Sequence, residues 1–386
     1  MNESVDFGEL PQSLVDDVLE RTKGIGQELL QSFEELRDKK EEWRGQLTNS
    51  GMVKHDSSLR PARSPTTCGV DGSHAVERLL ATDLVVAGAV AVEGLTPPSE
   101  KRFWPEPQHF VHVATEVHNP DTGSILRAGM IGMELILAQS APHGLVLLDG
   151  SFTSPIIYFN QGFSKAKEFA DLKTVKEYLV KEIKSFLTAY HCVLASQRSD
   201  RQWVAVPKYT THREIGRKLG WPASHDDRGL LSSVLEAGEY TIPTLLWQPT
   251  QPWHLNTSVV DDFTDVAERD EINELVAQVK QFLGNIHVLY YRPHAFMPAL
   301  RLEMSRAIAN NPARLSVVLQ GIKDQCGTAA IMEPYPLYLA DRMVKHLPRA
   351  IPAFRQITSQ YLAEDYQGDI DDVFVGLHSY RTESGR

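Results

Sequence analysis

Residues 144–151, Gly-Leu-Val-Leu-Leu-Asp-Gly-Ser, predict a buried β-strand that ends in an acidic turn. A short apolar run bounded by glycine and a turn is typical of a strand that is covered on both faces. The same Asp-Gly-Ser sequence stands at 71–73, in the predicted first strand of the chain. Glycine after the aspartate permits a sharp exit of the backbone or a close approach by a neighbour. The two stretches therefore place two carboxylates at the rim of a sheet, where ligands of open α/β sheets collect.

The elements around this strand indicate an α/β fold. Three strands come first and helices then alternate with strands, which matches a ribonuclease-H-like mixed sheet flanked by helices. The predicted strands cover about 69–73, 84–92, 109–118, 144–148, 203–208, 286–291 and 300–303, and the predicted helices cover about 9–47, 124–140, 163–193, 211–219, 310–324 and 334–347. We expect an N-terminal helical extension and loop (1–67), a ribonuclease-H-like nuclease domain (68–350, with an insertion at about 211–285) and a C-terminal peripheral segment (351–386).

The composition of the 386-residue chain predicts a globular, cytoplasmic protein. Apolar residues make up 42% and charged residues 23%, so a sizeable core can form. No apolar run reaches the roughly 18 residues of a membrane span, and the N-terminus lacks the layout of a signal peptide. Cys68, Cys192 and Cys326 are too widely spaced for a disulfide framework or a zinc site and fit a reducing compartment. The formal net charge of -11 excludes a protein that coats nucleic acid through overall positive charge, but it does not exclude a nuclease.

Four acidic residues, Asp71, Glu134, Asp149 and Asp341, are candidate metal ligands. In a ribonuclease-H arrangement the first and fourth strands are neighbours, so Asp71 and Asp149 would lie side by side and repel each other. One or two Mg²⁺ or Mn²⁺ ions remove that conflict, lower the pKa of an attacking water and stabilise the leaving oxygen in phosphodiester cleavage. We expect Asp71 to bridge the ions and Asp149 to hold one side, with Glu134 and Asp341 completing the shells.

Each of these acids also has a purely structural interpretation. A lone Asp-Gly-Ser sequence is usually a turn, although two of them after strands are less easily accidental. Glu134 could be a solvated helix residue, but apolar residues surround it at 130–137. Asp341 could simply pair with Arg342 or Lys345.

A group of basic residues follows the strand that ends near Lys208. Lys208 could neutralise phosphate charge in the transition state, or it could be a solvated lysine. Cationic residues at helical spacing suit phosphate contacts that position DNA, and these are His212, Arg213, Arg217 and Lys218. Three flanking aromatic residues could stack on bases, although aromatic side chains are more often core, and these are Trp203, Tyr209 and Trp221.

Taken in order, these motifs resemble the NurA nuclease family. The matching pieces between about residues 68 and 345 are Val70–Asp71–Gly72–Ser73, Leu126–Arg127 followed by Glu134, Leu147–Leu148–Asp149–Gly150–Ser151, Val206–Pro207–Lys208, the stretch 227–239, Tyr290–Tyr291–Arg292, and Tyr335–Pro336–Leu337 before Asp341. Many relatives carry His near the last acidic position, where this chain has Asp341, and the family's Tyr near the lysine motif corresponds best to Tyr209. Carboxylate in place of imidazole suits Mg²⁺ or Mn²⁺.

The resemblance implies a ribonuclease-H-like core, dependence on Mn²⁺ or Mg²⁺, and deoxyribonuclease action on DNA ends and single strands, as an exonuclease with possible endonuclease activity. It also implies a homodimer that works beneath a hexameric HerA-type ATPase, which pumps DNA into the nuclease. Such pairs act in end resection and repair or in anti-phage defence. No membrane is involved.

Other functions stay open beside this one. The long N-terminal helix could pair with another subunit, so the chain could be a catalytically silent adaptor of a HerA-like ring. An actin-like nucleotide-binding protein also has Asp-Gly loops after strands, but the sequence contains no Walker A motif and no convincing second phosphate loop. A zinc site at His109, His112 and His118 is disfavoured, because strand alternation places the first on the opposite face from the others. Asp226 and Asp227 fit a loop or cap better than a metal site.

Overall fold

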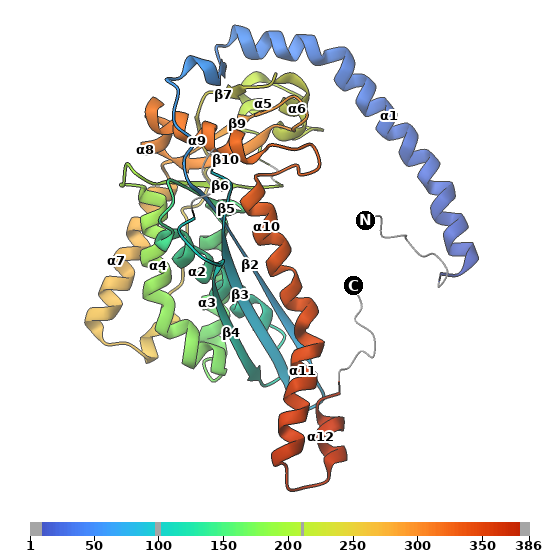
Figure 1. Cartoon of the computed structure of the whole chain (residues 1–386), viewed down its shortest axis with the longest axis vertical. Helices are drawn as coiled ribbons and strands as arrows, with labels where there is room; N and C mark the ends of the chain where they lie inside the picture. The colour runs from blue at the N-terminus through green and yellow to red at the C-terminus, as the bar shows by residue number, and fades with distance from the viewer. Residues whose placement is uncertain (1–9, 97–101, 210–211, 379–386) are drawn as a thin grey trace.

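A ten-stranded mixed sheet runs through the computed structural model, which describes residues 10–96, 102–209 and 212–378 (Figure 1). The strand order is β1-β7-β9-β10-β6-β5-β2-β3-β4, and β8 pairs with β9. The strands are β1 (Val53–His55), β2 (Thr67–Arg78), β3 (Asp83–Glu93), β4 (Gln108–Glu116), β5 (Leu145–Asp149), β6 (Gln202–Val206), β7 (Glu239–Thr241), β8 (Thr244–Leu245), β9 (Ile286–Tyr291) and β10 (Leu300–Ser305). The predicted mixed α/β fold is confirmed: the antiparallel meander β2-β3-β4 comes first, and β2 lies parallel to β5.

Helices cover both faces of this sheet (Figure 1). The helices are α1 (Gln12–Asn49), α2 (Thr122–Ser140), α3 (Ser154–Glu168), α4 (Val180–Ala195), α5 (Glu214–Leu219), α6 (Asp227–Val234), α7 (Val266–Leu283), α8 (Arg306–Ala309), α9 (Pro312–Gln325), α10 (Tyr335–Val344), α11 (His346–Asp365) and α12 (Ile370–Gly376). Of the helices in the described ranges, none has both the length and the apolar character that a bilayer crossing requires.

The alternation of side chains along β5 builds two cores, one on each side of the sheet. Val146 and Leu148 belong to the core shared with α2, α3, α4 and α7, whereas Leu145 and Leu147 belong to the core shared with α9 and α10. Successive strand residues point to opposite faces, so a strand between two helical layers must be apolar throughout. Burial of each such side chain stabilises the fold by about 1.5–3 kcal/mol. The continuous apolar run of the sequence thus follows directly from the position of β5 in the middle of the sheet.

The register of β2 against β5 fixes the positions of the two aspartates, although Asp71 lies inside β2, which continues to Arg78, beyond the predicted strand at 69–73. Val70 is paired with Leu148 in the parallel ladder, so Asp71 and Asp149 follow side by side. The prediction that the first and fourth of the predicted strands are neighbours is therefore confirmed. Because Val70 and Leu148 face the α2 core, alternation turns the next residue of each strand toward the face that carries α10.

Two predicted segments are wrong. The predicted helix at 163–193 is two helices, α3 and α4, and a π-helical turn at Thr174–Leu179 leads into α4. The break is held by a long-range contact that periodicity does not reveal: the Glu116 carboxylate at the end of β4 accepts the backbone N–H groups of Lys173 and Thr174. The predicted loop at 48–67 contains β1, which pairs with β7, and a 3₁₀ turn at Asp56–Ser58.

The first helix, α1, projects away from the sheet and its layers (Figure 1). Only Trp43 and Leu47, near its C-terminal end, are buried. Val15 and Leu36 are half-buried, and the other seven large apolar side chains of α1 are between 46% and 66% exposed: Leu14, Val18, Leu19, Ile25, Leu29, Leu30 and Phe33. An amphipathic helix of this length gains most of its stability by burying its apolar face. In this chain that face lies open to solvent over most of the helix.

Candidate metal centre

Three carboxylates meet at the rim of the sheet. Asp71 comes from β2, Asp149 is the last residue of β5, and Asp341 comes from α10, which packs across β2 and β3. One oxygen atom of each lies within 4.8 Å of the others. Asp71 is buried, and Asp149 and Asp341 are half-buried. Residues that are 270 positions apart in sequence thus form one pocket of oxygen atoms.

The glycine after each aspartate has its own physical reason. A Cβ atom on Gly72 would lie 2.6 Å from Oε1 of Glu134, so only glycine lets the Glu134 carboxylate approach β2 from α2. Gly150 has φ +82°, a left-handed conformation that turns the chain sharply after β5. Within each pair the glycine N–H donates to Oδ1 of the preceding aspartate at 2.8 Å. One oxygen of each aspartate is thereby oriented by the N–H group of the following glycine.

Two acids of this region, Asp71 and Glu134, have raised pKa values. Burial first, and then the charge of Asp149, raises the pKa of Asp71 to about 7. Burial, and then the charges of Asp71 and Asp149, raise the pKa of Glu134 well above its usual value. Glu134 is buried beside Gly72 and is not one of the three mutually close acids. Crowded carboxylates that resist ionisation supply the hard oxygen donors that suit a divalent cation, so this donor set fits Mg²⁺ or Mn²⁺.

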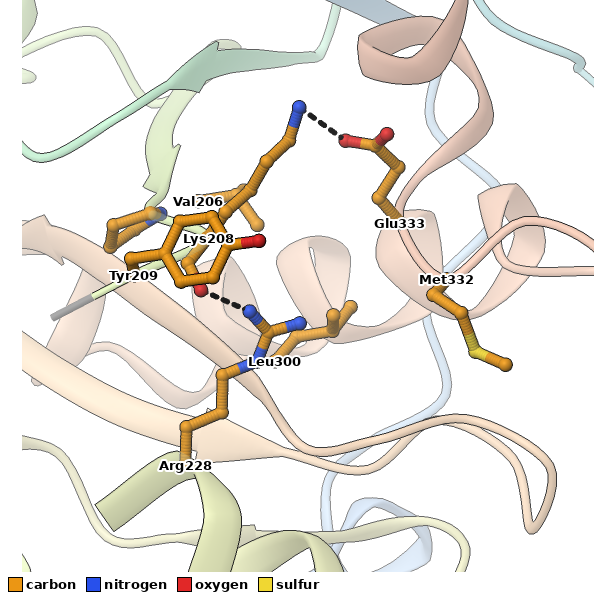
Figure 2. A pocket seen from close by; sticks show the side chains of 8 residues that line it. Val206, Lys208, Tyr209, Arg228, Leu300, Met332 and Glu333 are labelled. Carbon is orange, nitrogen blue, oxygen red and sulfur yellow. Dashed lines mark hydrogen bonds and ion pairs between the residues drawn. The ribbon is translucent and has the colours of Figure 1, made fainter. Parts of the chain in front are cut away.

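Lys208 lies inside the same cluster. It stands two residues beyond the end of β6, and its Nζ is 3.0 Å from Oδ2 of Asp149 and 3.5 Å from Oδ1 of Asp341. The third partner is Oε2 of Glu333 at 3.1 Å (Figure 2). Burial opposes charge on this lysine, but the carboxylates of Asp149 and Glu333 outweigh it and raise the pKa of Lys208. Lys345 adds a second ammonium group, 2.6 Å from Oδ2 of Asp341.

Glu333 is a site residue that the sequence analysis missed. It lies in the irregular segment between α9 and α10, where neither helical nor strand periodicity marks it. With Lys208, Tyr209, Arg228 and Met332 it lines a pocket of about 190 Å³ beside the acids (Figure 2). Its closeness in sequence to Asp341, eight positions away, is the sequence feature that could have pointed to a place near the acids.

Some of the predicted DNA-binding side chains are bonded within the fold, whereas others are exposed to solvent. Arg213 is committed to the fold, because its Nη2 donates to the backbone oxygens of Trp221 and Pro222. Trp221 is buried, and Trp203 is buried and donates to the Ala138 oxygen. For these two tryptophans the structure shows the core interpretation, which the sequence favoured over base stacking, since both rings lie in the hydrophobic core.

The remaining predicted contacts lie at the surface. Tyr209 is 93% exposed and stands directly after Lys208. Arg217 and Lys218 on α5 are exposed, and Nζ of Lys218 lies 3.4 Å from the Thr244 hydroxyl. The ring of His212 stacks on Trp247 with centroids 4.8 Å apart. Tyr209, Arg217 and Lys218 thus keep their functional groups open to solvent.

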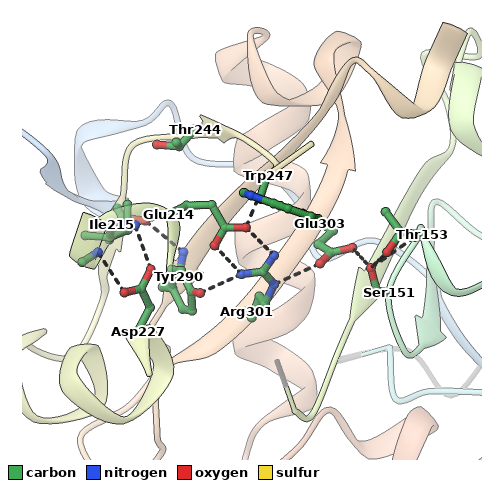
Figure 3. Close-up of polar contacts among 12 residues, drawn as sticks. Ser151, Thr153, Glu214, Ile215, Asp227, Thr244, Trp247, Tyr290, Arg301 and Glu303 are labelled. Atoms are coloured by element: carbon green, nitrogen blue, oxygen red, sulfur yellow. Dashed lines mark hydrogen bonds and ion pairs between the residues drawn. The ribbon is translucent and has the colours of Figure 1, made fainter. Parts of the chain in front are cut away.

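A buried polar network, which no local sequence pattern predicts, lies behind the acidic turn of β5 (Figure 3). Arg301 on β10 donates to both oxygens of Glu214 at 2.8 and 2.9 Å, to Glu303 at 2.9 Å and to the Tyr290 hydroxyl. Glu303 also accepts the Ser151 hydroxyl at 2.7 Å. The network therefore ties the Asp149–Ser151 turn to the middle of the sheet.

Two smaller groups of candidates have structural partners. The Asp226 carboxylate accepts the Gly229 N–H and caps α6, and Asp227 accepts the N–H groups of Ile215 and Gly216. The prediction of a cap or loop role for this pair is confirmed. His118 lies 2.7 Å from the Asp83 carboxylate, whereas the ring of His112 stacks on Tyr178.

Solved structures with the same arrangement of elements identify the fold. The chain is similar to the NurA nuclease from Sulfolobus solfataricus, with a TM-score of 0.59 and 11% identity over 93% of this chain and 99% of that chain. This chain has the NurA fold. A NurA structure with manganese (TM-score 0.51, 15% identity, 91% and 99% covered) and a further NurA structure (0.51, 16%, 92% and 99%) agree. No family model matches the sequence, and no curated protein matches it significantly. The NurA fold is thus recognised in three dimensions, across identities of 11–16%.

Proposed function

We propose that this chain is a divalent-metal-dependent nuclease that hydrolyses phosphodiester bonds in DNA. The observation that carries the proposal is the convergence of Asp71, Asp149 and Asp341, with mutual oxygen distances within 4.8 Å, next to Lys208. The NurA fold supports it, because one structure with this fold is a NurA with manganese. Mn²⁺ or Mg²⁺ is the cofactor that this oxygen donor set fits best.

The position of each side chain suggests its role in cation binding or in phosphate contact. Asp71, Asp149 and Asp341 hold the cation, and Glu134 completes the donor set from the α2 side. When bound, the cation lowers the pKa of water and stabilises charge on the phosphate oxygens. Lys208 offers an ammonium group to a phosphate oxygen at the same rim.

Residues near the rim give the DNA strand its contacts. Tyr209 offers an exposed ring for a base to stack on, and Arg217 and Lys218 offer cations to phosphates further along the strand. These contacts carry no base-specific hydrogen-bond pattern, so the cleavage is expected to be independent of sequence.

The finer part of the proposal concerns substrate and partners. We infer action on single-stranded DNA and on DNA ends, in a cytoplasmic homodimer that works with a HerA-type hexameric ATPase in end resection, repair or anti-phage defence. The family resemblance of the ordered motifs supports this part. The apolar face of α1, with side chains up to 66% exposed, offers a surface on which another subunit could pack.

A nuclease assay tests the activity directly. Purified protein is incubated with linear duplex and with single-stranded DNA in Mn²⁺, with and without the ATPase. Asp71→Ala and Asp149→Ala are each expected to abolish cleavage while circular dichroism and thermal unfolding show an intact fold. Absence of cleavage by the unmodified protein under all these conditions contradicts the proposal.

The second candidate is a catalytically silent adaptor of a HerA-like ring, and the exposed face of α1 is the observation that favours it. This function requires no chemistry at the acids. Equal biological activity of the unmodified chain and Asp71→Ala would favour the adaptor, whereas loss of that activity in Asp71→Ala favours the nuclease.

A further inference from the structure

Lys208 stands where a bound cation has to be accommodated. Its Nζ is 3.0 Å from Asp149 and 3.5 Å from Asp341, two of the three acids that converge. A divalent cation on those acids would repel an ammonium group at this distance, because the interaction of charges in a half-buried site is weakly screened. The same ammonium also compensates the two acids when no other cation is near. The position of Lys208 is therefore compatible with the metal-free site and in conflict with the metal-bound one.

Glu333 provides the alternative partner. Its Oε2 lies 3.1 Å from Nζ of Lys208, and it is not among the three mutually close acids. The pocket of about 190 Å³ that Lys208 and Glu333 both line gives the lysine side chain room on this side (Figure 2). A short displacement of Nζ away from Asp149 and Asp341 therefore leaves it in contact with a carboxylate.

The backbone of Lys208 is held in place while its side chain has this freedom. Arg228 donates from Nη1 to the Lys208 carbonyl oxygen and from Nε to the Ala299 oxygen at 3.2 Å. The guanidinium thus ties Lys208, two residues beyond the end of β6, to the residue before β10. A change of partner at Lys208 is consequently a rotation of one side chain and needs no movement of the sheet.

We propose that Lys208 is an internal counter-ion of the metal-free centre, and that Glu333 is the positioning residue that receives its ammonium group when a divalent cation binds. This inference rests on the proposed function, because it assumes that the acids bind such a cation. Glu333 keeps the displaced charge paired and keeps Lys208 at the rim, within reach of a phosphate. Without Glu333 the ammonium group remains on Asp149 and Asp341 and competes with the cation.

A double-mutant cycle on Mn²⁺ binding tests this role without any measurement of cleavage. Mn²⁺ is titrated by calorimetry, with the free ion followed by electron paramagnetic resonance, into the full chain without DNA. Glu333→Gln is expected to weaken Mn²⁺ binding by about tenfold, a typical coupling for a close charge pair. In a Lys208→Met background the same substitution is expected to change the affinity by less than about twofold, since no ammonium is left to place. Lys208→Gln replaces Lys208→Met if the methionine variant is not folded by circular dichroism.

Two results would overturn the role of Glu333. An equal loss of affinity in both backgrounds would show that Glu333 acts only through its negative charge. A larger loss in the Lys208→Met background would show that Glu333 is itself a ligand. Glu271→Gln is the matched control, because it removes the same charge from an exposed ion pair with Lys184 on the outer helices.

The unmodified chain and Asp71→Asn separate this inference from the proposed function. If the unmodified chain binds Mn²⁺ and Asp71→Asn does not, the metal centre is supported. The double-mutant cycle then tests only the role of Glu333. If the unmodified chain binds no Mn²⁺, or if Asp71→Asn binds it equally well, the metal centre falls and the role of Glu333 falls with it.

Discussion

Two groups of buried acids in this molecule lie in opposite electrostatic surroundings. In the network behind the site, Glu214 faces the guanidinium of Arg301 and makes two hydrogen bonds to it (Figure 3). In the metal centre, Asp71 and Glu134 face other carboxylates. Burial opposes ionisation in both places, but Arg301 lowers the pKa of Glu214, whereas the neighbouring acids help to raise the pKa of Asp71 to about 7.

The difference separates a structural use of charge from a functional one. A buried acid that serves the fold is matched by donors, because an uncompensated buried charge destabilises the folded state. The acids at the rim are buried or half-buried as well, but Asp71 and Asp149 each accept one glycine N–H, and the cations that pair with this cluster within the described residues are Lys208 and the exposed Lys345. Acids held in this condition by a stable fold indicate a site whose partner is a cation from solution. Compensation, more than the number of acids, therefore distinguishes the two groups.

The largest effect on stability is expected in the compensated network. Glu214→Gln leaves the fully buried Arg301 with half of its carboxylate partners, so the free energy of unfolding should fall by about 3 kcal/mol. Urea unfolding measures this change, and Glu271→Gln, in an exposed ion pair, should stay within about 0.5 kcal/mol. A loss below about 1 kcal/mol for Glu214→Gln would mean that the network does not depend on this pairing.

Removing the charge of Asp71 at the rim is expected to raise the free energy of unfolding, whereas removing the charge of Glu214 lowers it. Burial and the charge of Asp149 raise the pKa of Asp71 to about 7 in the folded protein from the ordinary aspartate value of 3.8, so between these pH values the folded state holds a proton that the unfolded state has released. The contribution of Asp71 to stability is therefore lost as pH rises from about 4 to about 7. Asp71→Asn should stabilise the metal-free protein by about 1–2 kcal/mol near pH 8, and have a smaller effect near pH 5.

Urea unfolding in a chelator at these two pH values gives the measurement. Excess Mn²⁺ should remove the advantage of the asparagine variant, because the cation compensates the charge that the unmodified chain carries. An Asp71→Asn variant that is less stable than the unmodified chain near pH 8 would show that Asp71 is compensated after all.

The sequence predicted the positions of Asp71 and Asp149 on neighbouring strands better than it predicted the partners of the buried charges. Asp149 ends β5 and Asp71 lies inside β2, each after apolar residues whose strand pattern is visible locally, and the parallel register of the two strands brings them together. The sequence did not predict Glu333 as a site residue, because Glu333 lies in an irregular segment without helical or strand periodicity. Arg301 escaped because charged residues in a short strand usually face water, and its burial depends on Glu214, 87 positions away. Such pairings exist only in three dimensions.

The smallest effect is expected at Lys345. Its Nζ lies 2.6 Å from Oδ2 of Asp341, four positions earlier on the α10 side, but its side chain is 64% exposed. An ion pair so open to solvent contributes little, so Lys345→Met should change the free energy of unfolding by no more than about 0.5 kcal/mol, and less at high salt. Urea unfolding at low and high salt checks this. A loss well above that size would mean that Lys345 compensates Asp341 as fully as Arg301 compensates Glu214. Asp341 would then belong with the compensated acids and not with the uncompensated acids of the metal centre.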